Sequence, residues 1–285
     1  MLEARRQDAP RKRAILPQEI SADCPYRRID GDPGCGLLLL CDHAGNAIPE
    51  AYGSLGLPAH ELHRHIAYDI GVAGVTERLA EALGAPALLT RFSRLLIDPN
   101  RGTDDPTLIM QLSDGRVVPG NAVLDEAERE ARITRYYEPY HRAIEASIDA
   151  AVATGKPPIV LAIHSFTSVL KGVKRPWHVT VLWDNDPRLA LPLLEGLQAL
   201  PGIVADDNVP YSGKLKGDTL YRHATMRGLA HALIEFRQDL ILSPEAQSEW
   251  ADRLARVLRK LLQDPELASR LHHVEHYGSH TDSAE

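Results

Sequence analysis

Two histidines stand where apolar segments of the chain end. His43 follows the run LLLLC, residues 37–41, and His164 closes the run IVLAIH, residues 159–164. If both runs are strands of one parallel sheet, the two side chains reach one crevice, because ligands of open α/β sheets bind beyond the carboxyl ends of the strands. Either histidine alone could be a hydrogen-bonded structural residue. Together they indicate a metal site built on imidazole.

A catalytic zinc site usually has three protein ligands and keeps a fourth position open for water or substrate. The segment HRHIAYDIG, residues 63–71, offers His63, His65 and Asp69 as the third ligand. Asp69 also stands at the start of an amphipathic segment, where an acidic residue can simply interact with the helix dipole. Residue types alone leave both interpretations open.

Glu235 lies in an otherwise apolar segment, LIEFRQD. An ionised carboxylate is costly there unless it is paired or faces a polar cleft. Arg237, two residues further on, would share its face if the segment is a strand. The segment therefore holds either a general base beside a cation, or a structural ion pair of Arg237 with Glu235 or Asp239.

The segment LLIDPNR, residues 95–101, ends another apolar stretch with Asp98, Asn100 and Arg101. The planar donors of arginine match a carboxylate, and an amide beside it would complete a clamp for a small acid. A loop-stabilising Asp–Arg pair is the alternative. Ser165 follows His164 but lacks the G-x-S-x-G turn of serine hydrolases. Phosphate-loop, dinucleotide-binding and H-E-x-x-H motifs are also missing, which removes several common enzyme classes.

Alternating strand and helix patterns must position these residues. Continuous apolar runs or strand-like patterns predict strands, and amphipathic patterns with Gly84, Gly155 or Ser243 at their ends predict helices. The strands are expected within 37–41, 85–98, 159–164 and 178–186, and the helices within 70–84, 125–153 and 244–263. Residues 228–241 remain ambiguous between helix and strand. The alternation predicts one three-layer α/β/α domain with a mixed, mostly parallel central sheet.

The two ends of the chain lack such patterns. Residues 1–30, rich in Arg, Lys, Pro and Asp, are expected to form an extended arm, and residues 266–285 a polar, frayed tail with four histidines. A single catalytic domain is expected between them, over residues 31–265.

The composition narrows the class of protein. The formal net charge of −7 argues against a nucleic-acid or anionic-membrane binder. Neither a secretion signal nor an apolar stretch of membrane-spanning length is present, so a cytoplasmic location is expected, and the oligomeric state is left open. The chain has 13 histidines but only three cysteines, without Cys-x-x-Cys spacing. A bound metal would therefore have imidazole and carboxylate ligands.

Five segments, taken in order, resemble the N-formylglutamate amidohydrolase family. They are CDHAGNAIPEAYG, AYDIGVAGVTERLAEALGAPALLTRFSRLLIDPNR, YYEPYHRAI, AIHSFTSVL and LIEFRQDLI, within roughly residues 36–260. The resemblance implies the fold of zinc-dependent exopeptidase-like and aminoacylase-like hydrolases, with one zinc ion. It also implies hydrolysis of an N-formyl amino acid with an acidic side chain, such as N-formylglutamate, to formate and the free amino acid, as in histidine degradation.

Carried over to this chain, the resemblance implies roles for particular residues. His43, from the family's H-[SA]-G turn, and His164, from its H-S strand end, are implied zinc ligands. Asp69 is our choice for the third ligand, although Asn46 occupies the spacing at which related peptidases place a glutamate. Glu235, in the E-[IF]-R-x-D-L motif, is the implied general base.

The same resemblance implies that Asn100 and Arg101 grip a substrate carboxylate. Further candidates for substrate binding, mostly for a second carboxylate, are Arg94, Arg237, Ser165 and Lys214 or Lys216. The turn CDHAGN replaces the Pro-His-Ser-Gly turn of the best-characterised branch, and the loop GKLKGDTLYRH, residues 213–223, also sets this chain apart. Two alternatives therefore remain, namely a zinc amidohydrolase or peptidase for another N-acyl amino acid or small amide, and a non-catalytic protein that binds a small acid.

Overall fold

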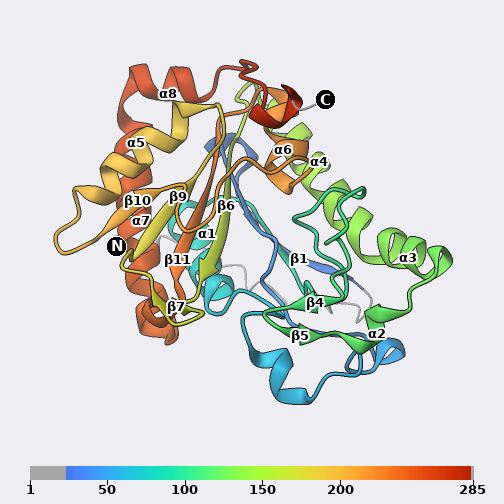
Figure 1. Cartoon of the computed structure of the whole chain (residues 1–285). Coiled ribbons are helices and arrows are strands. Elements are labelled where there is room, and N and C mark those ends of the chain that lie inside the picture. The colour runs from blue at the N-terminus through green and yellow to red at the C-terminus, as the bar shows by residue number, and fades with distance from the viewer. Residues whose placement is uncertain (1–23, 284–285) are drawn as a thin grey trace, which may run out of the picture.

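A seven-stranded mixed sheet forms the centre of the computed structural model, which describes residues 24–283 (Figure 1). In spatial order its strands are β1 (Tyr26–Ile29), β3 (Ala87–Thr90), β2 (Leu37–Cys41), β6 (Ile159–Phe166), β11 (His231–Arg237), β9 (Val179–Leu182) and β10 (Ala205–Asp207). Four of the six pairings are parallel, and only β1–β3 and β9–β11 are antiparallel. The predicted mixed, mostly parallel sheet is confirmed.

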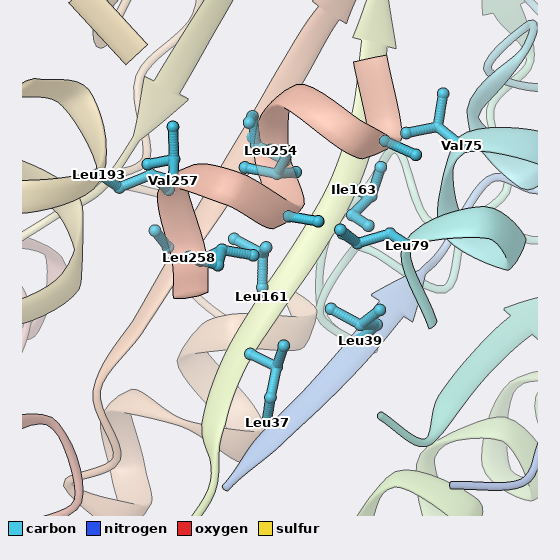
Figure 2. Packing of buried hydrophobic residues seen from close by; sticks show 14 of the residues in the cluster. Leu37, Leu39, Val75, Leu79, Leu161, Ile163, Leu193, Leu254, Val257 and Leu258 are labelled. Carbon is cyan, nitrogen blue, oxygen red and sulfur yellow. The ribbon is translucent and has the colours of Figure 1, made fainter. Parts of the chain in front are cut away.

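Helices cover both faces of the sheet. On one face lie α1 (Val72–Leu83), α5 (Pro187–Gln198), α7 (Pro244–Gln263) and α8 (Pro265–Leu271), and on the other lie α4 (Glu138–Ala153) and α6 (Thr219–His223) (Figure 1). Alternate residues of each strand serve the two faces, as the strand period of two requires. Figure 2 shows the first face, where Leu39 of β2 and Leu161 of β6 pack with Leu254 of α7.

Shorter elements complete the chain outside the central sheet. They are the hairpins β4 (Leu112–Ser113) with β5 (Arg116–Val117) and β7 (Val169–Leu170) with β8 (Val173–Lys174), and the helices α2 (Pro119–Ala122) and α3 (Glu126–Arg132). A third apolar cluster, with Leu95, Ile97 and Tyr137 among its members, supports the loops of this region. These loops carry residues 91–101 to the carboxyl edge of the sheet.

The predicted helix ends at Gly84 and Ser243 are confirmed. Gly84 follows α1 with a φ of 63° and donates its N–H to the carbonyls of Ala80 and Glu81. The Ser243 hydroxyl accepts the N–H of Ala246 and caps α7. The predicted helix over 125–153 is one helical run, but a π turn over Ile133–Tyr137 joins α3 to α4. Pro139 stands just after that turn and has no N–H to donate, which disfavours a regular α-helical turn there.

Other segments differ from the expectations. The strand expected over 85–98 ends at Thr90, and the strand expected over 178–186 covers only Val179–Leu182. The ambiguous segment 228–241 contains the strand β11. It lies between β6 and β9, so it is apolar on both faces, and such a run shows no period that separates strand from helix.

Both chain ends contribute to the fold within the described residues. Residues 1–23 of the expected arm lie outside them, but Tyr26–Ile29 form the edge strand β1. In the expected tail, α8 forms, Glu275 donates its N–H to the Gly228 carbonyl, and the Ser279 hydroxyl donates to Asp184. These contacts are made by polar groups, which hydrophobic periodicity does not report. No helix within residues 24–283 is long and apolar enough to cross a membrane.

Candidate active site

The carboxyl edge of the sheet brings His43, Asp69 and His164 together. His43 follows β2, and His164 is in β6, the parallel neighbour of β2. Asp69 precedes α1, and its N–H donates to the His43 carbonyl at 3.0 Å. All three residues are buried, and one ligand atom from each lies within 4.8 Å of the other two. The predicted crevice therefore holds a group of two imidazoles and one carboxylate that could bind a metal ion.

Two further carboxylates orient the imidazole rings. His43 Nε2 lies 2.7 Å from Asp98 Oδ1, and His164 Nε2 lies 2.9 Å from Asp42 Oδ2. Because an ionised carboxylate can only accept, each Nε2 carries a hydrogen, and in the neutral ring that a metal ion requires, Nδ1 is the atom with the lone pair. Both Nδ1 atoms face Asp69 Oδ2, at 3.4 Å from His43 and 3.0 Å from His164. This carboxylate–histidine arrangement is typical of metal ligands, so the donor set fits a divalent ion such as zinc.

The orienting carboxylates are themselves held in place. Asp42 Oδ1 accepts the hydroxyls of Tyr140 at 3.0 Å and Thr219 at 2.9 Å. Asp98 Oδ2 accepts from the Arg94 guanidinium at 2.7 Å. Burial alone would raise the pKa of both carboxyls, but the hydrogen bond and charge of His164 lower the pKa of Asp42, and the charge of Arg94 lowers that of Asp98. Both are therefore anionic at neutral pH.

Charges and hydrogen bonds also shift the pKa values within the candidate metal-binding group, which consists of His43, Asp69 and His164. Despite burial, hydrogen bonds from the two histidines hold the pKa of Asp69 well below its usual value. Burial disfavours protonated His164, but hydrogen bonds to Asp42 and Asp69 outweigh it and raise its pKa to about 10. Without a metal ion, a proton on His164 Nδ1 therefore supplies the positive charge, and metal binding must displace it.

Glu235 stands beside His164 on the next strand. The two residues are direct partners in the β6–β11 register, so both side chains project from the same face of the sheet. Glu235 is 7% exposed, and its Oε2 atom is buried with no hydrogen-bond partner. Burial raises the pKa of Glu235 to about 7, with the charge of His164 opposing the rise. A carboxyl group with a pKa near 7 suits general acid–base catalysis.

A cavity of about 370 Å³ opens over these residues. Asn100 and Arg101, in the loop after residue 98, line this cavity. Arg94 and Ser165 also line it, from other segments. The Asn100 side-chain oxygen accepts the N–H of Thr219 at 3.1 Å, and Arg101 donates to the Asn100 carbonyl at 2.7 Å. The first bond connects the loop to α6, and both residues line the same cavity as His43, Asp69 and His164.

Some residues singled out from the sequence have other partners. Arg237 pairs with Asp239 at 2.8 Å and donates to the Pro176 carbonyl, and it does not line the cavity. Of the two structural ion pairs considered for this segment, the one between Arg237 and Asp239 forms. Asn46 donates to the Leu62 carbonyl at 2.8 Å and is not among the cavity residues. Lys214 and Lys216 are exposed and also lie outside the lining.

Of the remaining candidates, His65 and Ser165 line the cavity, whereas His63 is exposed and does not. His65 lies 3.5 Å from Asp114, and burial lowers its pKa. The Ser165 hydroxyl donates to the Ile70 carbonyl at 3.2 Å and accepts from Gln238 at 3.3 Å, so no base is aimed at it.

Sequence reasoning did not assign the roles of Asp42 and Asp98 toward the histidines. Asp42 is separated from His164 by 122 residues, and Asp98 from His43 by 55. The only signal was that each aspartate follows an apolar run, as the two histidines do.

The chain is similar to known proteins over most of its length. A family model described as N-formylglutamate amidohydrolase matches residues 35–242. A solved structure of a gene product from Agrobacterium tumefaciens has a TM-score of 0.79 and 36% identity, covering 85% of this chain and 96% of that chain. The N-formylglutamate amidohydrolase from Ralstonia eutropha has a TM-score of 0.63 and 22% identity over 83% of this chain and 96% of that one, which shows a shared fold. No curated protein matches the chain.

Proposed function

Because the chain belongs to the N-formylglutamate amidohydrolase family, we propose that it hydrolyses the amide bond of an N-formyl or other short N-acyl amino acid, with a zinc ion held by His43, Asp69 and His164. The observation that carries this proposal is the pair of oriented imidazoles around the Asp69 carboxylate, beside a buried carboxyl without a partner. When bound, zinc supplies a Lewis acid and lowers the pKa of water toward about 7.

Glu235 is the general base in this proposal. Its buried, unpaired oxygen would accept a proton from the attacking water and return it to the nitrogen of the leaving amine. Water thus adds to the acyl carbon, the C–N bond breaks, and the products of an N-formyl substrate are formate and the free amino acid. Such a positioned acid–base group contributes about 10² to 10⁴ in rate.

Asn100 and Arg101 bind the substrate carboxylate. The guanidinium of Arg101 donates to the Asn100 carbonyl and the Thr107 hydroxyl, both of them uncharged. It therefore keeps its charge available for an anion at the cavity wall. N-formylglutamate, the compound in the description of the family, carries two carboxylates. Asn100 and Arg101 would bind one of them.

Substitution of the base tests the mechanism. We expect Glu235→Gln to keep zinc binding and to lower kcat by about 10² to 10⁴, because the amide cannot accept the proton. Turnover of N-formyl amino acids would be followed by formate release, and zinc content by metal analysis of the same preparation. Asp149→Asn, a change at an exposed carboxylate of α4, is the matched control. Wild-type turnover by the Glu235→Gln variant would remove the base from the mechanism.

A further inference from the structure

The charges that line the cavity are unevenly paired. Arg94 lies 2.7 Å from Asp98 and 3.8 Å from Asp69, so two carboxylates already neutralise it. Arg101 forms no ion pair with an acidic residue among residues 24–283 and donates only to uncharged groups there. Within residues 24–283, no other arginine and no lysine lines the cavity. The described lining therefore provides one free permanent cation and can neutralise one substrate carboxylate.

Two aspartates, Asp184 and Asp218, also line the cavity. Asp184 accepts the Ser279 hydroxyl at 2.5 Å and the His280 N–H at 3.1 Å. Asp218 accepts the N–H of Tyr221 at 2.6 Å. Asp184 also pairs with His280, and burial raises the pKa of Asp218 to about 7. Neither aspartate offers a cation to a second substrate carboxylate.

Three leucines give the cavity an apolar surface. Leu233 of β11 and Leu182 of β9 are register partners, and Leu220 of α6 packs with them in one cluster. All three line the cavity. Leu233 precedes Glu235 by two positions, so it projects from the same face at about 7 Å along the strand. The side chain of a substrate amino acid can span about this distance from an acyl carbon placed beside Glu235.

Aromatic side chains add to this surface. The cavity lining includes Phe166, Trp183, Tyr211 and Tyr221. The polar groups near them are occupied, since Trp183 Nε1 donates to Asp207 at 2.8 Å and Tyr221 donates its hydroxyl to Asp282 at 2.7 Å. Apolar and aromatic walls with few unpaired polar groups favour an apolar substituent.

We propose that the preferred substrates are N-formyl or short N-acyl derivatives of apolar amino acids, with one carboxylate and a side chain of the size of leucine, methionine or phenylalanine. The carboxylate binds at Arg101, and the side chain lies on the surface formed by Leu182, Leu220 and Leu233. This inference rests on the proposed function. It departs from the acidic substrate that the family resemblance implied.

Two measurements on the full chain test the substrate class. The first compares kcat/KM for N-formyl-leucine, N-formyl-phenylalanine and N-formylglutamate with the zinc-loaded protein, and we expect at least a tenfold advantage for the apolar substrates. The second compares binding of 4-methylpentanoate with that of glutarate by calorimetry, and we expect the monoacid to bind more tightly.

The outcomes separate the two proposals. A kcat/KM for N-formylglutamate equal to or above that for the apolar substrates would overturn the inference and leave the proposed function standing. If no substrate is hydrolysed, the proposed function fails, and the binding comparison then decides the inference alone. Tighter binding of glutarate would overturn it, and tighter binding of 4-methylpentanoate would support it.

Variants locate the preference on the leucine surface. We expect Leu233→Ala to lower kcat/KM for N-formyl-leucine about tenfold relative to N-formylglycine, because a pocket methylene contributes that order of discrimination. Leu88→Ala, a buried leucine of the same cluster outside the lining, is the matched control. Leu215→Arg, in a half-buried loop position of the lining, should raise kcat/KM for N-formylglutamate about tenfold. Unchanged ratios in both Leu233→Ala and Leu215→Arg would contradict the proposed side-chain site.

Discussion

The hydrogen bond between Asp42 and His164 determines which imidazole nitrogen is free for a metal ion. Asp42 is 1% exposed, and its two oxygens have separate partners. Oδ1 accepts the hydroxyls of Tyr140 and Thr219, and Oδ2 faces His164 Nε2 at 2.9 Å. Asp42→Asn can keep the first two bonds on its carbonyl oxygen, but its NH₂ group then faces Nε2.

Two donors cannot share that contact, so the ring must change its tautomer. The amide would donate to Nε2, and the ring would hold its hydrogen on Nδ1, the atom that faces Asp69 and would otherwise bind the metal ion. A hydrogen bond to a charged group contributes about 1.5 to 3 kcal/mol, and each 1.4 kcal/mol is a factor of ten. Zinc binding should therefore weaken by about 10- to 100-fold, the range seen when partners of metal-binding histidines are replaced.

The assay is zinc affinity by competition with a chromophoric chelator at pH 7, together with an unfolding curve for each variant. Asp149→Asn, which removes a carboxylate from a surface pair with Arg227, is the control that changes the same net charge. Zinc affinity equal to that of the wild type in a folded Asp42→Asn variant would refute the assigned tautomer, and with it the use of Nδ1 as ligand atom.

Three other predictions follow from the same structure. His43→Ala and His164→Ala should each lower zinc content well below the wild-type value, because each removes one of three ligand atoms; undiminished metal in both would rule out the site. Arg101→Ala should raise KM at least tenfold for N-formyl amino acids but not for their carboxamide analogues, whereas the exposed Arg142→Ala should change neither. Burial and the charge of Arg222 lower the pKa of His223 to about 3, so the unfolded chain, with a pKa near 6.5, binds the extra proton as the pH falls. The free energy of unfolding should thus fall by about 2 kcal/mol between pH 7 and pH 5, and denaturant titrations of His223→Gln should lack this component; an identical pH dependence would contradict the assignment.

Much of the architecture could be predicted from local patterns. The runs that became β2 and β6 were recognisable because buried parallel strands are continuously apolar. The caps at Gly84 and Ser243 were recognisable because they act within one helical turn. The segment of β11 was ambiguous, since strand and helix both allow an apolar run and only its neighbours β6 and β9 decide between them.

The position of the metal-binding group was also accessible from the sequence. His43 and His164 each end an apolar run, and parallel strands present their carboxyl ends at one edge. Asp69 was one of several candidates, and the fold places it beside the two histidines, where its backbone N–H is bonded to the His43 carbonyl.

Residue types and their spacing along the chain thus determined the α/β class, the crevice at the strand ends and the kind of metal ligand. Only the tertiary structure decided which nitrogen of each histidine faces Asp69, which arginine keeps a free charge and what surface lies beside Glu235. The physical reason is that hydrophobic periods and caps act over a few residues. Orientation and charge pairing, such as that of Asp42 with His164, depend on contacts between segments that only folding brings together.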